Sequence, residues 1–266
     1  MSTTPPAAPL SGRLAQLRAA RRPALVCYVT AGHPDRAASL RLLRELPAAG
    51  ADVIEVGVPF SDPLADGPVI QGSSQVALDQ GMTLEGTLAL VNEARPTAPV
   101  VLFSYLNPLL AAGPQVLQRA ADAGVAGVLV TDLPVGADPA REAWLGGGPL
   151  EFVRLVAPTT PRARMAEIAQ HGKGFVYLIS RLGVTGMQDR LAAELPATVR
   201  MLREVCTLPI CVGFGISSPA QAREVAALAD GVVVGSALVR AAGEAGVDAA
   251  LALVRGLRAA LDGGPA

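Results

Sequence analysis

Eight short apolar runs, each followed by a loop and a helix-like stretch, are the feature that most limits what this chain can fold into. The runs are continuously apolar rather than alternating, which is typical of parallel strands covered by helices on their outer face. We expect strands at residues 24–30, 53–58, 100–105, 127–132, 152–156, 175–180, 209–213 and 232–235. Eight strand–helix units in 266 residues predict an α/β fold, a single (β/α)₈ TIM barrel.

Helical periodicity fills the stretches between these strands. Pro34, Thr83 and Ser218 stand where helices commonly begin. The expected helices span residues 35–49, 83–95, 114–123, 137–144, 163–170, 191–205, 219–228 and 248–261. An extra N-terminal helix at residues 10–20 precedes the first strand, and we expect it to close the bottom of the barrel.

The main alternative fold is a doubly wound open sheet, which usually carries a glycine-rich dinucleotide turn after its first strand. Here the first strand leads into residues 31–35, Ala-Gly-His-Pro-Asp, which is not a GxGxxG turn. The barrel is therefore favoured.

Residues 1–9 carry no cationic or long apolar run and are expected to form a flexible tail, which leaves residues 10–266 as one catalytic domain.

Charge and cysteine content restrict the partners and the compartment. The chain has 22 Lys and Arg against 23 Asp and Glu, so neither nucleic acid nor an anionic membrane is expected as a partner. Cys27, Cys206 and Cys211 form no CxxC pair and lie in or beside apolar runs, as reduced core cysteines do. Strand-length apolar runs and the lack of a targeting signal predict a cytoplasmic protein.

In a TIM barrel the active site lies at the C-terminal ends of the strands. Glu55 is a carboxylate inside an otherwise apolar strand, where an ionised group needs a partner, a proton or a polar cavity. Either it forms a structural salt bridge or it faces a substrate. The stiff, proline-rich loop that follows adds Asp62 and Asp66. Both suit ordinary turns, but Asp66 is the better candidate for a second carboxylate in the Glu55 pocket.

Glycines follow the last three strands. Residues 180–186, Ser-Arg-Leu-Gly-Val-Thr-Gly, suit a lid over the substrate or an ordinary flexible connection. Glycines within residues 213–217 and 234–236 allow backbone N–H groups to approach an anion, at the two loops where this fold commonly binds phosphate. Together these loops predict a small-molecule phosphorylated substrate.

Missing residue types narrow the chemistry further. The only lysine, Lys173, precedes the sixth strand at the end of the barrel away from the expected site, which disfavours Schiff-base and pyridoxal-phosphate enzymes. His33 and His171 are the only histidines, so no metal site is expected. Carboxylate acid–base catalysis on a phosphorylated substrate, without a cofactor, is the chemistry left.

The segment 51–68, Ala-Asp-Val-Ile-Glu-Val-Gly-Val-Pro-Phe-Ser-Asp-Pro-Leu-Ala-Asp-Gly-Pro, resembles the signature of the tryptophan synthase α-subunit family. Shorter matches follow in family order at residues 28–32, 129–134, 177–181, 183–186 and 213–217, so the resemblance covers essentially the whole chain. Members of that family cleave indole-3-glycerol phosphate to indole and glyceraldehyde 3-phosphate in tryptophan biosynthesis. The resemblance implies this retro-aldol reaction.

By the same resemblance, Glu55 is the general acid and base and Asp66 is the second catalytic carboxylate. The substrate contacts that it implies are Tyr177, Thr185, Phe103, Leu129 and Ile70. The phosphate contacts are Gly186, Gly215, Gly235 and Ser236. One departure from the family pattern is Tyr28, which stands where phenylalanine is frequent.

The resemblance also implies a partner, a pyridoxal-phosphate β subunit that receives the indole through an internal tunnel in an α₂β₂ tetramer. Pro59 and Asp62 match positions at that contact. The nearest alternative is a stand-alone indole-3-glycerol-phosphate lyase that is active without a β subunit. A phosphosugar isomerase or epimerase, a catalytically silent barrel that only activates a partner, and a flavin-binding barrel are weaker alternatives.

Overall fold

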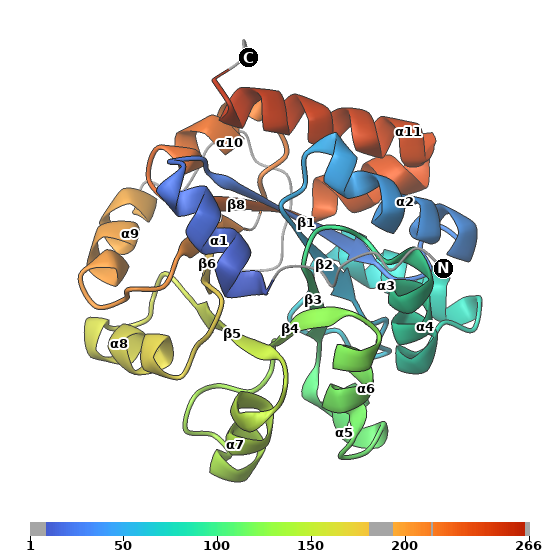
Figure 1. The fold of residues 1–266 in the computed structure, drawn as a ribbon, viewed down its shortest axis with the longest axis horizontal. Coiled ribbons are helices and arrows are strands. Elements are labelled where there is room, and N and C mark those ends of the chain that lie inside the picture. Colours follow the sequence, from blue (N-terminus) through green and yellow to red (C-terminus); the bar gives the residue numbers. More distant parts are fainter. Residues whose placement is uncertain (1–8, 181–193, 214, 264–266) are drawn as a thin grey trace.

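The computed structural model describes residues 9–180, 194–213 and 215–263, which form a closed barrel of eight parallel strands (Figure 1). The strands pair in sequence order, and the last strand pairs back with the first. They are β1 (Ala24–Thr30), β2 (Val53–Gly57), β3 (Val100–Ser104), β4 (Val125–Val130), β5 (Glu151–Val156), β6 (Val176–Ile179), β7 (Ile210–Gly213) and β8 (Gly231–Val234). The (β/α)₈ barrel predicted from the sequence is confirmed.

Helices form an outer ring around the strands (Figure 1). They are α1 (Leu10–Ala19), α2 (Arg36–Ala49), α3 (Pro68–Asp79), α4 (Leu84–Ala94), α5 (Leu106–Ala111), α6 (Val116–Asp122), α7 (Pro139–Gly147), α8 (Arg162–Gln170), α9 (Leu195–Arg203), α10 (Pro219–Ala226) and α11 (Ser236–Leu261). Side chains of Asp35, Thr83 and Ser218 accept backbone N–H groups and so cap α2, α4 and α10. None of the described helices is long and apolar enough to cross a membrane.

Three helical segments differ from the sequence-based expectation. The helices α3 and α5 were not expected, because α3 contains glycine and two serines and α5 is only six residues long. The last helix was expected only from residue 248, but α11 already begins at Ser236 and changes direction at Gly246, where φ is 83°. Packing on the barrel, rather than intrinsic propensity, holds these segments.

Side chains of each strand alternate between the barrel interior and the layer beneath the helices. Leu10, Leu14 and Leu17 of α1 join the interior cluster with residues such as Val26 and Val101, all of them buried. Leu10 also lies so close to Gly127 and Gly174 that a side-chain carbon at either position would crowd it. The helix α1 therefore closes the bottom of the barrel, as expected.

A buried ion cluster around Asp52 holds α1 against the bottom of the barrel. The Asp52 carboxylate is 2% exposed and accepts hydrogen bonds from Arg13 at 2.6 Å, Arg22 at 2.9 Å and Arg258 at 3.1 Å. It also accepts from the backbone N–H of Leu25 at 3.0 Å. One carboxylate thus joins α1, the start of β1 and the end of α11, segments that are far apart in the sequence.

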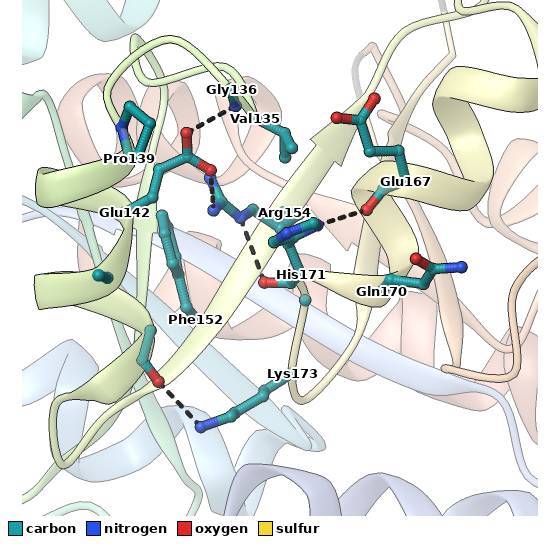
Figure 2. Close-up of a pocket in the computed structure, with 13 residues that line it drawn as sticks. Val135, Gly136, Pro139, Glu142, Phe152, Arg154, Glu167, Gln170, His171 and Lys173 are labelled. Carbon is teal, nitrogen blue, oxygen red and sulfur yellow. Dashed lines mark hydrogen bonds and ion pairs between the residues drawn. The ribbon is translucent and has the colours of Figure 1, made fainter.

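A second buried ion pair lies on the flank of the barrel, where β5 runs between α7 and α8 (Figure 2). The Arg154 guanidinium packs 3.8 Å from the centre of the Phe152 ring and donates to Glu142 at 2.8 Å. It also donates to the carbonyl oxygens of Leu133 and His171. Every side of this outward-facing arginine therefore has a partner inside the protein.

We expect the Asp52 cluster to contribute strongly to stability. Asp52→Asn should lower the free energy of unfolding by about 3 kcal/mol, because it removes the buried carboxylate that three arginines share and leaves only Asp262 to pair with Arg22 and Arg258. The matched control is Glu93→Gln, whose partner Arg36 is about half exposed and whose loss should cost less than about 1 kcal/mol. Urea unfolding followed by circular dichroism measures both, and equal losses would contradict the assignment.

Candidate active site

A cavity of about 50 Å³ opens among the C-terminal ends of the strands. The residues that line it are Tyr28, Glu55, Asp66, Ile70, Phe103, Tyr177, Gly215, Val233, Gly235 and Ser236. They come from β1, β2, β3, β6 and β8 and from the segments that follow β2, β7 and β8. The fold thus gathers eight of the residues predicted from the sequence at one end of the barrel.

Glu55 is the most deeply buried acid of this cavity. Its side chain extends from β2 into the barrel and is 1% exposed, and its Oε1 atom has no hydrogen-bond partner among the described residues. Burial raises the pKa of Glu55 to about 8 by destabilising the charged form. Within the described part of the chain no ion pair involves Glu55, so the alternative of a structural salt bridge finds no support there. A pKa of about 8 favours the protonated carboxyl at neutral pH, and Glu55 lines the cavity.

Asp66 has a different environment in the same cavity. The Tyr105 hydroxyl donates to Asp66 Oδ2 at 2.9 Å and accepts the backbone N–H of Ala65 at 2.9 Å. Burial raises the pKa of Asp66 to about 6, and the hydrogen bond from Tyr105 opposes that rise. Asp66 is therefore mostly ionised at neutral pH while Glu55 is not.

Tyr105 and Tyr28 are site residues to which the sequence analysis gave no role. The chain has only three tyrosines, and all three lie at the mouth of the barrel, with Tyr177 as the third. Two strand glycines make room for two of them, since a side-chain carbon at Gly57 or Gly213 would overlap a tyrosine hydroxyl. A signal was present in the sequence, because each tyrosine lies in or directly after an expected strand in a chain with few aromatics.

The segment that follows β8 offers backbone donors to the cavity. Gly235 and Ser236 line the cavity at the N-terminus of α11, and no side chain caps that end of the helix. The N-terminus of α10, in contrast, is occupied by a capping box of Ser218 and Gln221. The uncapped N–H groups of α11 and the helix dipole favour an anion at this wall. Gly215, at φ 87°, faces the same space.

The remaining predicted residues have other positions. Leu129 is fully buried in the barrel interior and is not among the residues that line the cavity. Thr185 and Gly186 lie outside the described residues. Pro59 is buried at the start of the loop after β2, while Asp62 is exposed further along it. The roles of these residues stay predictions.

A larger hollow, about 500 Å³, lies between α7 and α8 on the flank of the barrel (Figure 2). Its charged groups are engaged within the protein: Arg154 with Glu142, and Lys173 with the carbonyl oxygen of Gly146 at 3.0 Å. Among the described residues, no three His, Cys, Asp or Glu side chains gather as a metal site would require. The smaller cavity, with its unpartnered carboxyl oxygen, is therefore the better candidate for catalysis.

Comparison with known proteins agrees with this geometry. A family model described as "Tryptophan synthase alpha chain" matches residues 14–259. The tryptophan synthase alpha chain of Phenylobacterium zucineum is 46% identical over 241 residues, 89% of this chain and 87% of that protein. The one from Caulobacter vibrioides is 48% identical over 232 residues, 85% of this chain and 84% of that protein.

Solved structures give the same result. Tryptophan synthase from Mycobacterium tuberculosis has a chain that superposes with a TM-score of 0.88 at 36% identity, covering 96% of this chain and 98% of that one. The alpha subunit from Legionella pneumophila superposes with a TM-score of 0.87 at 35% identity, covering 96% and 98%. By family match, sequence identity and fold, the chain belongs to the tryptophan synthase α-chain family.

Proposed function

We propose that the cavity around Glu55 and Asp66 is where this chain carries out the reaction of its family. The chain is a carbon–carbon lyase of the tryptophan synthase α type, which cleaves indole-3-glycerol phosphate to indole and glyceraldehyde 3-phosphate. The observation that carries the site assignment is the buried Glu55, whose Oε1 has no hydrogen-bond partner among the described residues, in the cavity that Asp66 also lines.

In this proposal the neutral Glu55 carboxyl donates its proton to C3 of the indole ring. The ring then carries a positive charge, and Asp66 stabilises it by accepting a hydrogen bond from the indole N–H. The bond between C3 and the glycerol carbon breaks, and its electron pair restores the neutral ring. The adjacent hydroxyl becomes the aldehyde, and its proton returns to the Glu55 carboxylate. Protons balance, and Glu55 ends as it began.

The two carboxylates have the protonation states that these roles need. A general acid must hold a proton at working pH, as burial ensures for Glu55, whereas a group that accepts from the indole N–H must be ionised. Tyr105 fixes the direction of Asp66 through the hydrogen bond at 2.9 Å. The phosphate is proposed to bind the backbone N–H groups of Gly235 and Ser236 at α11. Phe103 and Ile70 supply apolar walls for the indole.

The family implies a β-subunit partner, and we propose that the chain binds it in an α₂β₂ tetramer through the loop after β2. Leu64 lies on this loop with its apolar side chain 87% exposed, so it is available for contact with a partner. Asp62 is exposed on the same loop as Asp66. A partner that binds at Asp62 would therefore act on the position of Asp66 through the backbone of this loop.

The unpaired, buried cysteines support a cytoplasmic setting as part of the same proposal.

Replacing the carboxylates tests the assignment. Glu55→Gln should lower kcat by about 10³-fold, and Asp66→Asn by about 10²-fold, the usual contributions of a general acid–base group and of a charge-stabilising group. The measurement is indole release from indole-3-glycerol phosphate, with a β subunit present. Glu55→Gln should also be at least as stable as the parent protein above pH 6, because it removes a buried acid. Substantial activity in Glu55→Gln would contradict the proposal.

The pH dependence provides a second test. The rate kcat/KM should fall as pH rises through about 8, where the free enzyme loses the Glu55 proton. It should also fall as pH drops through about 6, where Asp66 becomes protonated. The expected profile is therefore a bell with its maximum near pH 7, and Asp66→Asn should abolish the acidic limb only. A profile that is flat between pH 5 and pH 9 would be inconsistent with these roles.

The partner surface can be tested separately. Leu64→Ser should weaken binding of a β subunit about tenfold in isothermal titration calorimetry, a loss of about 1.4 kcal/mol. The matched control is Met201→Ser on α9, a similarly apolar side chain exposed away from the loop, which should bind as the parent does. If the parent chain turns over rapidly alone and no β subunit binds or activates it, the stand-alone lyase is the correct alternative.

A further inference from the structure

One hydroxyl at the barrel mouth has no task in the proposed reaction, that of Tyr28. Tyr28 faces the cavity from β1 and lies directly opposite Glu55 in the pairing of β1 with β2. Its ring is 6% exposed and packs edge-to-face on Phe103, with the ring centres 5.2 Å apart. The ring is thus held firmly beside the strand that carries Glu55.

Gly57 determines where the Tyr28 hydroxyl lies. Gly57 follows Glu55 by two residues on β2, so both positions face the barrel interior, one above the other. A side-chain carbon at Gly57 would overlap the Tyr28 hydroxyl, which shows that the hydroxyl occupies the space directly above Gly57. The hydroxyl therefore lies above Gly57, two residues beyond Glu55 on the interior face of β2, toward the end of the strand that opens to the cavity.

The proton of that hydroxyl is uncommitted. Ser73 Oγ donates its proton to the Ile70 carbonyl at 2.8 Å. Thr30 Oγ1 also lies 2.7 Å from Ser73 Oγ, and either hydroxyl can be the donor in that contact. In the contact of 3.5 Å between Thr30 Oγ1 and the Tyr28 hydroxyl, at the limit of a hydrogen bond, Thr30 donates and the Tyr28 oxygen accepts, so the Tyr28 proton is not used there. Tyr28 is a donor in need of an acceptor.

Glu55 needs a donor only in its ionised form. A neutral carboxyl tolerates burial, but a buried carboxylate without hydrogen bonds is costly, and Glu55 Oε1 has no partner among the described residues. We propose that Tyr28 is a positioning residue whose hydroxyl donates a hydrogen bond to the Glu55 carboxylate formed when Glu55 gives up its proton. This inference rests on the proposed role of Glu55.

The other cavity tyrosine is less suited to this task. The Tyr177 hydroxyl lies against Gly213 on β7, and β6 pairs with β5 and β7 rather than with β2. Tyr28 shares a strand pair with Glu55, so the same backbone hydrogen bonds fix both side chains. Because the Tyr28 side chain is already held in place, little conformational entropy is lost when its hydroxyl forms a hydrogen bond.

The test is a titration of Glu55 in the protein without substrate. Infrared difference spectra follow the protonated carboxyl band between pH 5 and pH 10, and the band that disappears in Glu55→Gln is that of Glu55. In Tyr28→Phe the pKa of Glu55 should be about one unit higher than in the parent, because the charged form loses a hydrogen bond. The matched control is Thr30→Val, which removes the neighbouring hydroxyl of the same strand and should leave the titration unchanged.

Kinetics give an independent measurement. In Tyr28→Phe, kcat should fall about tenfold with KM unchanged, and the basic limb of kcat/KM should move to higher pH by the same amount as the titration. A second variant, Gly57→Ala, displaces the hydroxyl without removing it and should raise the pKa of Glu55 in the same direction. It keeps the test available if Tyr28→Phe does not fold.

Two outcomes separate this inference from the proposed function. If Glu55→Gln is inactive but Tyr28→Phe and Gly57→Ala leave the Glu55 titration where it was, the role of Tyr28 is wrong and that of Glu55 stands. If Glu55→Gln keeps its activity, the proposed function fails, while the infrared titration still reports whether the hydroxyl and the carboxylate interact. A loss of kcat without any shift in titration would also overturn the inference.

Discussion

The candidate site depends on one costly arrangement, a carboxyl group held inside a closed barrel with no ion-pair partner among the residues that the structure describes. Glu55 is buried because β2 is one of eight strands that exclude water together, with α1 closing the bottom. Burial alone raises the pKa of Glu55 to about 8 and makes an ordinary acid into a proton donor at neutral pH. Other parts of the site complete this proton donor. The strand β2 fixes its position, Asp66 is the second carboxylate of the cavity, and Tyr28 supplies a hydroxyl.

Two carboxylates in one small cavity keep different protonation states because their neighbours differ. Asp66 is on a loop, retains some contact with solvent and accepts a hydrogen bond from Tyr105, whereas Glu55 is on a strand surrounded by apolar side chains. Tyr105 also binds the backbone of Ala65, so one hydroxyl on the β3 side fixes both the loop and its carboxylate. Any movement of that loop, including one caused by a partner, would change the environment of Asp66 first.

Charged groups are paired at the bottom of the barrel, whereas some polar groups at its mouth have no partner among the described residues. At the bottom, Asp52 has three arginines and a backbone N–H, and on the flank Arg154 has a partner on every side. At the mouth, within the part of the chain that the structure describes, Glu55 Oε1 has no hydrogen-bond partner and no side chain caps the first N–H groups of α11. Paired charges hold the fold together, and unpaired polar groups mark the surface kept ready for a substrate, at some cost in stability.

The sequence by itself determined the barrel and its two carboxylates, because these depend on local patterns. Continuous apolar runs mark parallel strands, and a lone acid within one of them, followed by a stiff acidic loop, marks the pocket. Only the tertiary structure decided which side chains meet, since closing the barrel brings together strands that are far apart in the sequence. The helices α3 and α5, the depth of Leu129 and the convergence of Tyr28 and Tyr105 all follow from that closure. No local periodicity encodes such contacts, because each depends on the shape of a partner strand and on a glycine that leaves room.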